Sequence, residues 1–278
     1  MSNRIVRVQL SDRSVIPTEA EVHVTVVPEV IDFQTDVRGR LVGPRCRYAD
    51  TVEVAYPLRP WQVPTSQPAI TLRAVVPEAS LWDPESPHLY LGPVELWQNG
   101  QRVDSREIRH GLRHVSVGPR GLRVNGRLWR LRGRRVDTVD DATALQLRRA
   151  GYNLIIVPAS DAARRAWEVA DRVGLFVLGE ESAAPSGERW RELVGHPSCL
   201  GWLRPATVSA DVPANVLDGV RADPEGAPRA SFVACPLAAF RDPIGGGPHR
   251  PVLLLDVPPD QAATLLDRHP SVIGVVDP

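Results

Sequence analysis

The feature that most constrains the fold is a change in hydrophobic periodicity partway along the chain. Before residue 116, segments such as 21–26 (EVHVTV) and 70–74 (ITLRA) alternate with period two, which is typical of half-buried β-strands. From about residue 128, short apolar runs alternate with stretches of helical spacing. The sequence therefore predicts two domains, an all-β domain over residues 1–115 and an α/β domain over residues 116–278.

The first domain is predicted to be a β-sandwich rather than a parallel sheet, because its short strands are separated by Pro and Gly clusters. Asn99-Gly100 is typical of a two-residue hairpin turn, and it connects candidate strands at 94–97 and 102–104. Residues 31–50 are polar and rich in Arg and Gly, and we predict a long loop there.

The second domain is predicted to be a compact (β/α)8-type barrel or a doubly wound sheet. Candidate strands begin near residue 128 and then occupy 152–157, 175–178, 199–203, 231–235, 251–256 and 272–276. Candidate helices occupy 140–149, 161–173, 186–194, 213–220 and 261–268. Seven strands in the 151 residues from 128 to 278 is short for such a barrel, which usually has roughly 250 residues, so an incomplete barrel is one expectation. The Pro- and Gly-rich segment 240–248 stands where an eighth strand could have been.

The charged residues exclude several chemistries. All 33 basic residues are arginine, which excludes Schiff-base lysines and the lysine of a phosphate-binding loop. Catalysis would have to come from Asp, Glu, His, Tyr, Ser or Cys. The 33 acidic residues bring the net charge to zero, which argues against a dedicated polyanion binder. Three scattered cysteines fit neither a disulfide framework nor a zinc site, and we expect no cofactor.

Targeting and partner signals are few. The N-terminus lacks the apolar core of a signal peptide and no stretch has the length of a membrane span, so we expect a cytoplasmic protein with no membrane partner. Seven arginines lie between residues 120 and 135. They could form a basic stripe for phosphate or nucleic acid, or simply a solvated hairpin face; we predict no nucleic-acid partner.

Three stretches carry recognisable motifs. They are residues 81–90 (LWDPESPHLY); then 108–113 (IRHGLR), 122–127 (LRVNGR) and 131–133 (LRG); and finally 151–153 (GYN), 170–175 (ADRVGL), Glu180, 196–198 (HPS) and Trp202. Taken in order, they resemble the glycoside hydrolases of family 2, the β-galactosidase and β-glucuronidase group. The resemblance covers about residues 15–205 well and the remainder loosely.

The resemblance implies an immunoglobulin-like sandwich followed by a (β/α)8-type barrel, and a history of retaining β-glycoside hydrolysis. That chemistry needs two carboxyl groups roughly 5–5.5 Å apart. The family places its acid/base in an Asn-Glu pair shortly after "HPS…W", and this position falls on Ala206-Thr207. Threonine cannot protonate a leaving group near neutral pH. The nucleophile position falls on Asp256, at the end of 250–256 (RPVLLLD), where the family has glutamate.

Other candidate site residues follow from the same alignment of motifs. Glu180 is a candidate substitute acid, Trp202 a candidate for sugar stacking, and Asp137 and Arg135 candidates for substrate binding. Glu181 and Asp277 are further carboxylates expected near the same end of the barrel. A structural alternative is that these acids neutralise nearby arginines, namely Arg134, Arg135 and Arg204.

Three functional hypotheses remain open from the sequence. The first is a family 2-like protein that has lost catalysis and serves as a carbohydrate-binding or protein-interaction module. The second is an active glycosidase with a relocated carboxylate pair. The third is an oligomerising scaffold without a sugar site, which a barrel end closed by arginines would favour. The corresponding partners are a carbohydrate, another protein or a second copy of the chain.

Overall fold

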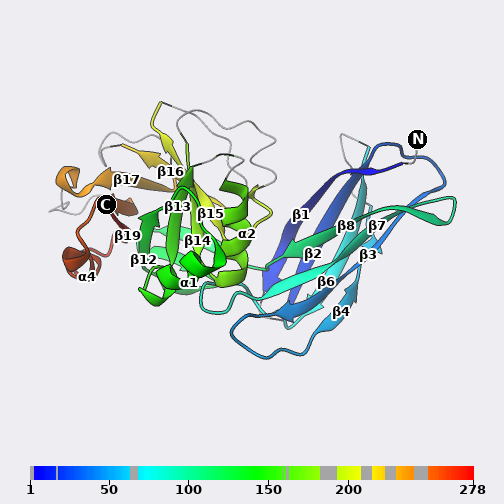
Figure 1. The fold of residues 1–278 in the computed structure, drawn as a ribbon, viewed down its shortest axis with the longest axis horizontal. Coiled ribbons are helices and arrows are strands. Elements are labelled where there is room, and N and C mark those ends of the chain that lie inside the picture. The colour runs from blue at the N-terminus through cyan, green and yellow to red at the C-terminus, as the bar shows by residue number, and fades with distance from the viewer. Residues whose placement is uncertain are drawn as a thin grey trace. The chain divides into compact units, whose positions relative to one another are not determined.

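A computed structural model describes residues 3–16, 18–62, 68–158, 160, 163–181, 193–207, 215–222, 230–240 and 250–278. The chain forms two compact units, which we describe separately (Figure 1). The sandwich unit comprises Met1–Trp82, Ser86–Leu112 and Gly195–Pro197. The barrel unit comprises Asp83–Glu85, Arg113–Val194 and Ser198–Pro278.

The sandwich unit contains two four-stranded antiparallel sheets, with strand orders β1-β2-β6-β5 and β4-β3-β7-β8. The strands are β1 (Ile5–Ile16), β2 (Glu19–Pro28), β3 (Thr35–Arg45), β4 (Val54–Pro57), β5 (Arg59–Pro60), β6 (Ile70–Pro77), β7 (Leu89–Gln98) and β8 (Gln101–His110). One cluster of buried side chains takes members from both sheets, for example Val24 of β2 and Leu96 of β7. The predicted β-sandwich is therefore confirmed in its two-sheet form.

The hairpin between β7 and β8 has the predicted turn. Asn99 and Gly100 have φ angles of 53° and 75°, in the left-handed region that a tight type I′ turn requires at both positions. Asn tolerates this region better than most residues, and Gly has no Cβ to oppose it.

The predicted loop over residues 31–50 is wrong, because β3 occupies Thr35–Arg45 between β4 and β7. Val37 and Leu41 are buried, whereas the arginines of this strand lie on its solvent side, so the alternation is present but weak. Gly39 weakens the alternation further, because it places no side chain on the strand. A Cβ at Gly39 would lie 2.5 Å from the carbonyl oxygen of Pro93. The close approach of the neighbouring strand therefore requires glycine at a position where the sequence suggested a loop.

The barrel unit begins with a three-stranded antiparallel sheet and continues into a closed barrel of eight parallel strands. The small sheet consists of β9 (Val115–Gly118), β10 (Gly121–Val124) and β11 (Arg127–Trp129). The barrel strands are β12 (Leu131–Arg135), β13 (Leu154–Pro158), β14 (Phe176–Glu180), β15 (Cys199–Pro205), β16 (Leu217–Arg221), β17 (Phe232–Pro236), β18 (Val252–Leu255) and β19 (Val272–Asp277). The helices described are α1 (Asp141–Arg149), α2 (Arg164–Val173) and α4 (Pro259–Arg268), with a short 3-10 helix at Leu237–Ala239.

The helix signals of the sequence are confirmed where the structure describes them. The side chain of Asp140 caps α1 by accepting a hydrogen bond of 2.8 Å from the backbone N–H of Thr143. Gly174 ends α2 with a φ of 77°, the left-handed conformation of a helix C-terminus. The predicted Asp161 cap, most of the predicted helix 186–194 and segment 241–248 lie outside the described residues.

The predicted helix over residues 213–220 is wrong, because Leu217–Arg221 is the barrel strand β16. The polar and glycine residues of this segment obscured the strand. Gly219 faces the barrel interior, where a Cβ would lie 2.2 Å from the ring of Phe232. Asp218 faces outward and pairs with Arg204. With β16 in place the barrel has eight strands rather than the seven predicted.

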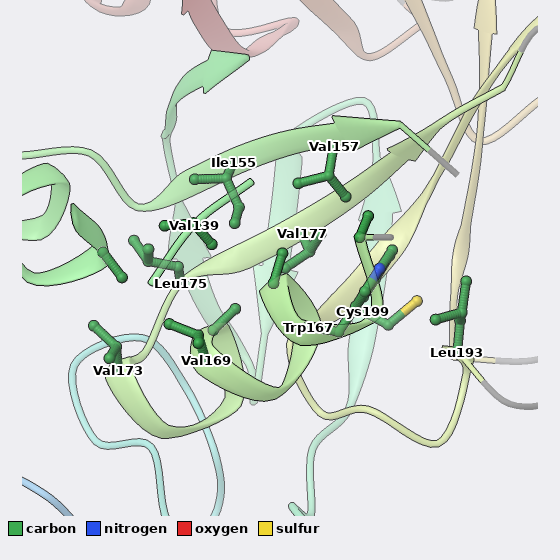
Figure 2. Packing of buried hydrophobic residues seen from close by; sticks show 14 of the residues in the cluster. Val139, Ile155, Val157, Trp167, Val169, Val173, Leu175, Val177, Leu193 and Cys199 are labelled. Carbon is green, nitrogen blue, oxygen red and sulfur yellow. The ribbon is translucent and has the colours of Figure 1, made fainter. Parts of the chain in front are cut away.

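The outer side of the barrel wall packs on the helices through a continuous apolar cluster (Figure 2). Ile155, Val157 and Val177 project outward from β13 and β14 and meet Trp167 and Val173 of α2. This burial holds the strands in register and so fixes the side chains at their carboxyl ends. In the part of the chain that the structure describes, no helix combines the length and apolarity needed to cross a membrane.

Candidate functional site

Four charged residues meet at the carboxyl end of the barrel, which we call the barrel mouth: Arg135, Glu180, Arg221 and Asp256. Arg135, Glu180 and Arg221 are the last residues of β12, β14 and β16, and Asp256 follows β18 directly. Alternate strands of an eight-stranded barrel contribute side chains to the same interior layer. The strand order alone therefore brings these groups together at the end where barrel enzymes place their active sites.

Arg135 connects the two carboxylates that the sequence singled out. Its Nη1 donates to Oδ1 of Asp256 at 3.0 Å, and its Nε lies 3.4 Å from Oε2 of Glu180. The hydrogen-bonded neighbours of β12 are β13 and β19, so Arg135 reaches across the barrel opening to make both contacts. The Arg135 side chain is 35% exposed, so this ion-pair network lies at the rim of the opening rather than in the dry interior.

Arg221 provides a second cation for Glu180. Its Nη1 donates to Oε1 of Glu180 at 3.1 Å, and its Nη2 donates to the backbone carbonyl of Glu181, also at 3.1 Å. Each oxygen of the Glu180 carboxylate therefore faces a guanidinium group. A carboxyl group held in this way accepts hydrogen bonds, whereas a general acid must carry a proton and donate it.

Asp256 has an unusual backbone conformation, with a φ of 57°. Among residues other than glycine, Asp and Asn are the ones that adopt the left-handed region most readily. The conformation turns the chain sharply where β18 ends and places the carboxylate at the rim, where its side chain is 53% exposed. Aspartate is thus compatible with this turn.

Trp202 does not lie where a sugar could stack. Its side chain is fully buried and packs on Trp167, with ring centroids 6.0 Å apart and an interplanar angle of 25°. It projects to the outer side of β15, into the cluster beneath α2, because its neighbour Leu203 takes the alternate side of the strand. The assignment of Trp202 to substrate binding is therefore a sequence expectation that this geometry does not support.

Arg204 and Asp277, two further candidates from the sequence, have other partners. Arg204 makes a bidentate, buried ion pair with Asp218 on the outer side of β15 and β16, with N–O distances of 2.7 and 2.6 Å. Asp277 accepts a hydrogen bond from the hydroxyl of Tyr152, and this bond, together with burial, raises the pKa of Tyr152. The Arg204–Asp218 pair thus lies on the outer side of the barrel wall, whereas Asp277 is the last residue of β19 and is held by Tyr152.

One residue of the barrel mouth, Arg221, and one residue of the outer barrel wall, Asp218, were missed from the sequence. Arg221 directly follows the segment 213–220 that was predicted as a helix, although the spacing of Leu217, Gly219 and Arg221 matches one face of a strand. Asp218 was missed for the same reason. The period-two spacing of a strand is present in the sequence, but it is recognisable only once the structure shows an eighth barrel strand there.

The arginine run 120–135 is mostly engaged within the barrel unit. Arg127 pairs with Glu85 and lies 4.9 Å from the centroid of the Trp129 ring, and Arg130 donates to the carbonyl oxygen of Val272 at 2.7 Å. Further contacts are made by Arg123 to the Gly126 carbonyl, Arg132 over the Tyr152 ring, and Arg135 at the barrel mouth. The run therefore does not form a free basic stripe.

Comparison with known proteins agrees with a two-part fold of this kind. Residues 5–113 match the family model described as glycosyl hydrolases family 2. The resemblance to that family is thereby confirmed. No curated protein sequence matches the chain.

Solved structures match nearly the whole chain at low sequence identity. A family 2 member from Bacteroides cellulosilyticus is 15% identical with a TM-score of 0.69, and covers 99% of this chain and 44% of its own. The β-glucuronidase of Bacteroides uniformis is 12% identical with a TM-score of 0.70, and covers 99% and 46%. A β-glycosidase from Bacteroides vulgatus is 15% identical with a TM-score of 0.66, and covers 92% and 39%. The chain thus spans less than half the length of these proteins, and the likeness establishes a shared fold.

Proposed function

We propose that this chain is a family 2 glycosidase-like protein whose barrel mouth does not hydrolyse glycosides. In this proposal the barrel is a contracted (β/α)8 barrel, preceded by an immunoglobulin-like sandwich, and the chain serves as a carbohydrate-binding or protein-interaction module in the cytoplasm. The observation that carries it is the contact of one side chain, Arg135, with both remaining carboxylates, Glu180 and Asp256.

Retaining hydrolysis requires one carboxylate free to attack the anomeric carbon and one carboxylic acid free to protonate the leaving group. At this barrel mouth the guanidinium of Arg135 occupies the space beside Asp256, and the two oxygens of Glu180 face Arg135 and Arg221. Thr207, the residue at the family's acid/base position, is exposed just beyond the end of β15 and has no acidic proton to give. These groups support ion pairing better than proton transfer.

The direct test is hydrolysis of aryl β-glycosides by the purified full chain. We expect release of the aryl alcohol at the rate of a no-protein control. Asp256→Asn and Glu180→Gln serve as matched variants, since each removes one charge with little change of shape. Turnover by the unmodified protein that either variant abolishes would refute the proposal and establish an active glycosidase with a relocated carboxylate pair.

A further inference from the structure

Among the described edge strands of the sandwich unit, β4 (Val54–Pro57) is the one without a charged residue. It pairs with β3 on one side, and no strand of the described chain pairs with its other side (Figure 1). Edge strands of natural proteins commonly carry charged side chains, which prevent pairing with another chain. The edge strand β1 contains two arginines and an aspartate, β8 contains five charged residues, and β5 consists of an arginine and a proline. The sequence of β4, Val-Ala-Tyr-Pro, has no such charge.

The strand pattern of the sequence begins before the segment that pairs with β3. Residues 51–56 (TVEVAY) alternate with period two, which places Val52, Val54 and Tyr56 on one face. Tyr56 packs against the apolar core of the sandwich unit, but Val54 is 46% exposed and Val52 is 84% exposed. The ladder with β3 begins only at Val54. Residues 51–53 therefore continue the strand pattern beyond the paired segment, and a strand added at the free edge would bury both valines together.

The backbone of this segment also presents hydrogen-bonding groups at the free edge. Leu58, the residue after β4, donates its N–H to the carbonyl oxygen of Gly39 on β3 at 3.0 Å. Along an antiparallel ladder, residues that bond to the neighbouring strand alternate with residues whose N–H and C=O groups point the other way. Counted from Leu58, this alternation directs the backbone groups of Val54 toward β3. Those of Ala55 point to the free edge, and an extended backbone at Glu53 continues the same pattern.

We propose that residues 51–57 pair antiparallel with the same segment of a second copy of the chain, about a two-fold axis at Val54. In this register, Ala55 of each copy forms a hydrogen-bonded pair with Glu53 of the other. Val54 meets its own counterpart in a non-hydrogen-bonded pair, the kind in which side chains approach most closely. Val52 lies opposite Tyr56 of the other copy, an aromatic and β-branched pair that stabilises antiparallel sheets. The segment is thus self-complementary, and the inference holds whether or not the barrel mouth is catalytic.

Charge and proline select this axis over its neighbours. An axis at Glu53 would set two carboxylates directly opposite each other, which destabilises a strand pair. An axis at Ala55 would pair Glu53 with Pro57, which has no N–H to donate. With the axis at Val54, Glu53 faces the small side chain of Ala55 and keeps its own ion pair with Arg45, whose Nε lies 2.7 Å from Oε2. Residues 51–57 are fewer than the roughly 20–30 residues that each partner contributes to a standard interface, so we expect a weak dimer with a Kd of about 10–100 µM.

Sedimentation velocity of the full chain over a range of concentrations tests the proposal. We expect the average mass to rise from that of a monomer at about 1 µM to nearly that of a dimer at about 1 mM. Val54→Lys should weaken the dimer at least about tenfold, because the two substituted side chains bring like charges together at the axis. Val6→Lys, at a 60% exposed valine of the edge strand β1, is the matched control and should leave the dimer unchanged. A monomer at every concentration, or equal effects of the two substitutions, would overturn the proposal.

Cross-linking locates the axis independently of affinity. Counterparts in a non-hydrogen-bonded pair have Cα atoms about 4.5 Å apart, a separation that a disulfide can span. Cys46→Ser first removes the one cysteine that is not buried. In that background, Val54→Cys should give a disulfide-linked dimer under copper-catalysed air oxidation. Thr51→Cys should not, because its counterpart lies about 20 Å away along the paired strands.

The two cysteine variants also separate the register from a general loss of structure. Neither Thr51 nor Val54 is buried, so circular dichroism should show both variants folded. Cross-linking of Thr51→Cys as efficient as that of Val54→Cys, or cross-linking of neither, would contradict the proposed pairing.

Discussion

Removal of Arg135 should destabilise the barrel unit through the two carboxylates that it bridges, and the size of the effect can be worked from the structure. At 3.0 Å and an effective dielectric constant of about 20, one unit charge pair interacts by about 5 kcal/mol. The side chains are 23–53% exposed, so solvent screening reduces the net value of each pair to about 1 kcal/mol or less. We therefore expect Arg135→Gln to cost about 1–2 kcal/mol in total.

A double-mutant cycle measures the pairwise part of this cost. The four proteins are the unmodified chain, Arg135→Gln, Asp256→Asn and the combination, and thermal unfolding is followed by circular dichroism. We expect a coupling energy of about 0.5–1 kcal/mol, and a fall in the midpoint of about 2–4 °C for each kcal/mol lost. A second cycle with Glu180→Gln should give a larger coupling, because Glu180 is less exposed and is contacted by two arginines.

Two controls show whether the effect is electrostatic. Raising the ionic strength to 1 M should reduce both coupling energies, since the screening length falls to about 3 Å. Arg120→Gln removes an exposed arginine that has no ion pair among the described residues, and it should leave the midpoint within about 1 °C. A coupling energy indistinguishable from zero at low salt, or one that does not respond to salt, would refute the reasoning that the barrel mouth is held by ion pairs.

Three further predictions concern packing and pH. Burial raises the pKa of Tyr90 to about 12, above the ordinary value of 10. The stability that the neutral phenol contributes is therefore complete below pH 10 and is lost as the pH rises toward 12. Tyr90→Phe should flatten this part of the pH profile of the thermal midpoint. Gly219→Ala should cost about 1–3 kcal/mol of unfolding free energy, because its Cβ would enter the Phe232 ring. Phe232→Leu in the same chain should recover part of this loss, and purely additive losses in urea unfolding would count against this geometry. Trp202→Ala should cost about 3–5 kcal/mol in the same assay by emptying the site beside Trp167, and a fully stable variant would contradict its placement in the core.

The Arg221–Glu180 pair shows why the sequence did not predict Arg221 as part of the barrel mouth. Glu180 and Asp256 follow apolar runs, and such runs predict buried strands whose ends carry the site of a barrel. Arg221 follows a short segment of Asp, Gly and Val that has no such run, because its interior position at Gly219 is filled by the ring of Phe232 from the next strand. The missing apolar side chain was supplied by a residue 13 positions away, which periodicity within one segment does not reveal.

Sequence reasoning predicted the two-part organisation, the hairpin at Asn99-Gly100, and the helix ends at Asp140 and Gly174. These are local properties, set by side-chain periodicity, backbone conformation and residue type. The tertiary structure alone decided the closure of the barrel at eight strands, the burial of Trp202 on its outer side, and the contact of Arg135 with Glu180 and Asp256. Each of these depends on which strands become neighbours or face one another across the barrel. That arrangement is fixed by packing between segments far apart in the chain.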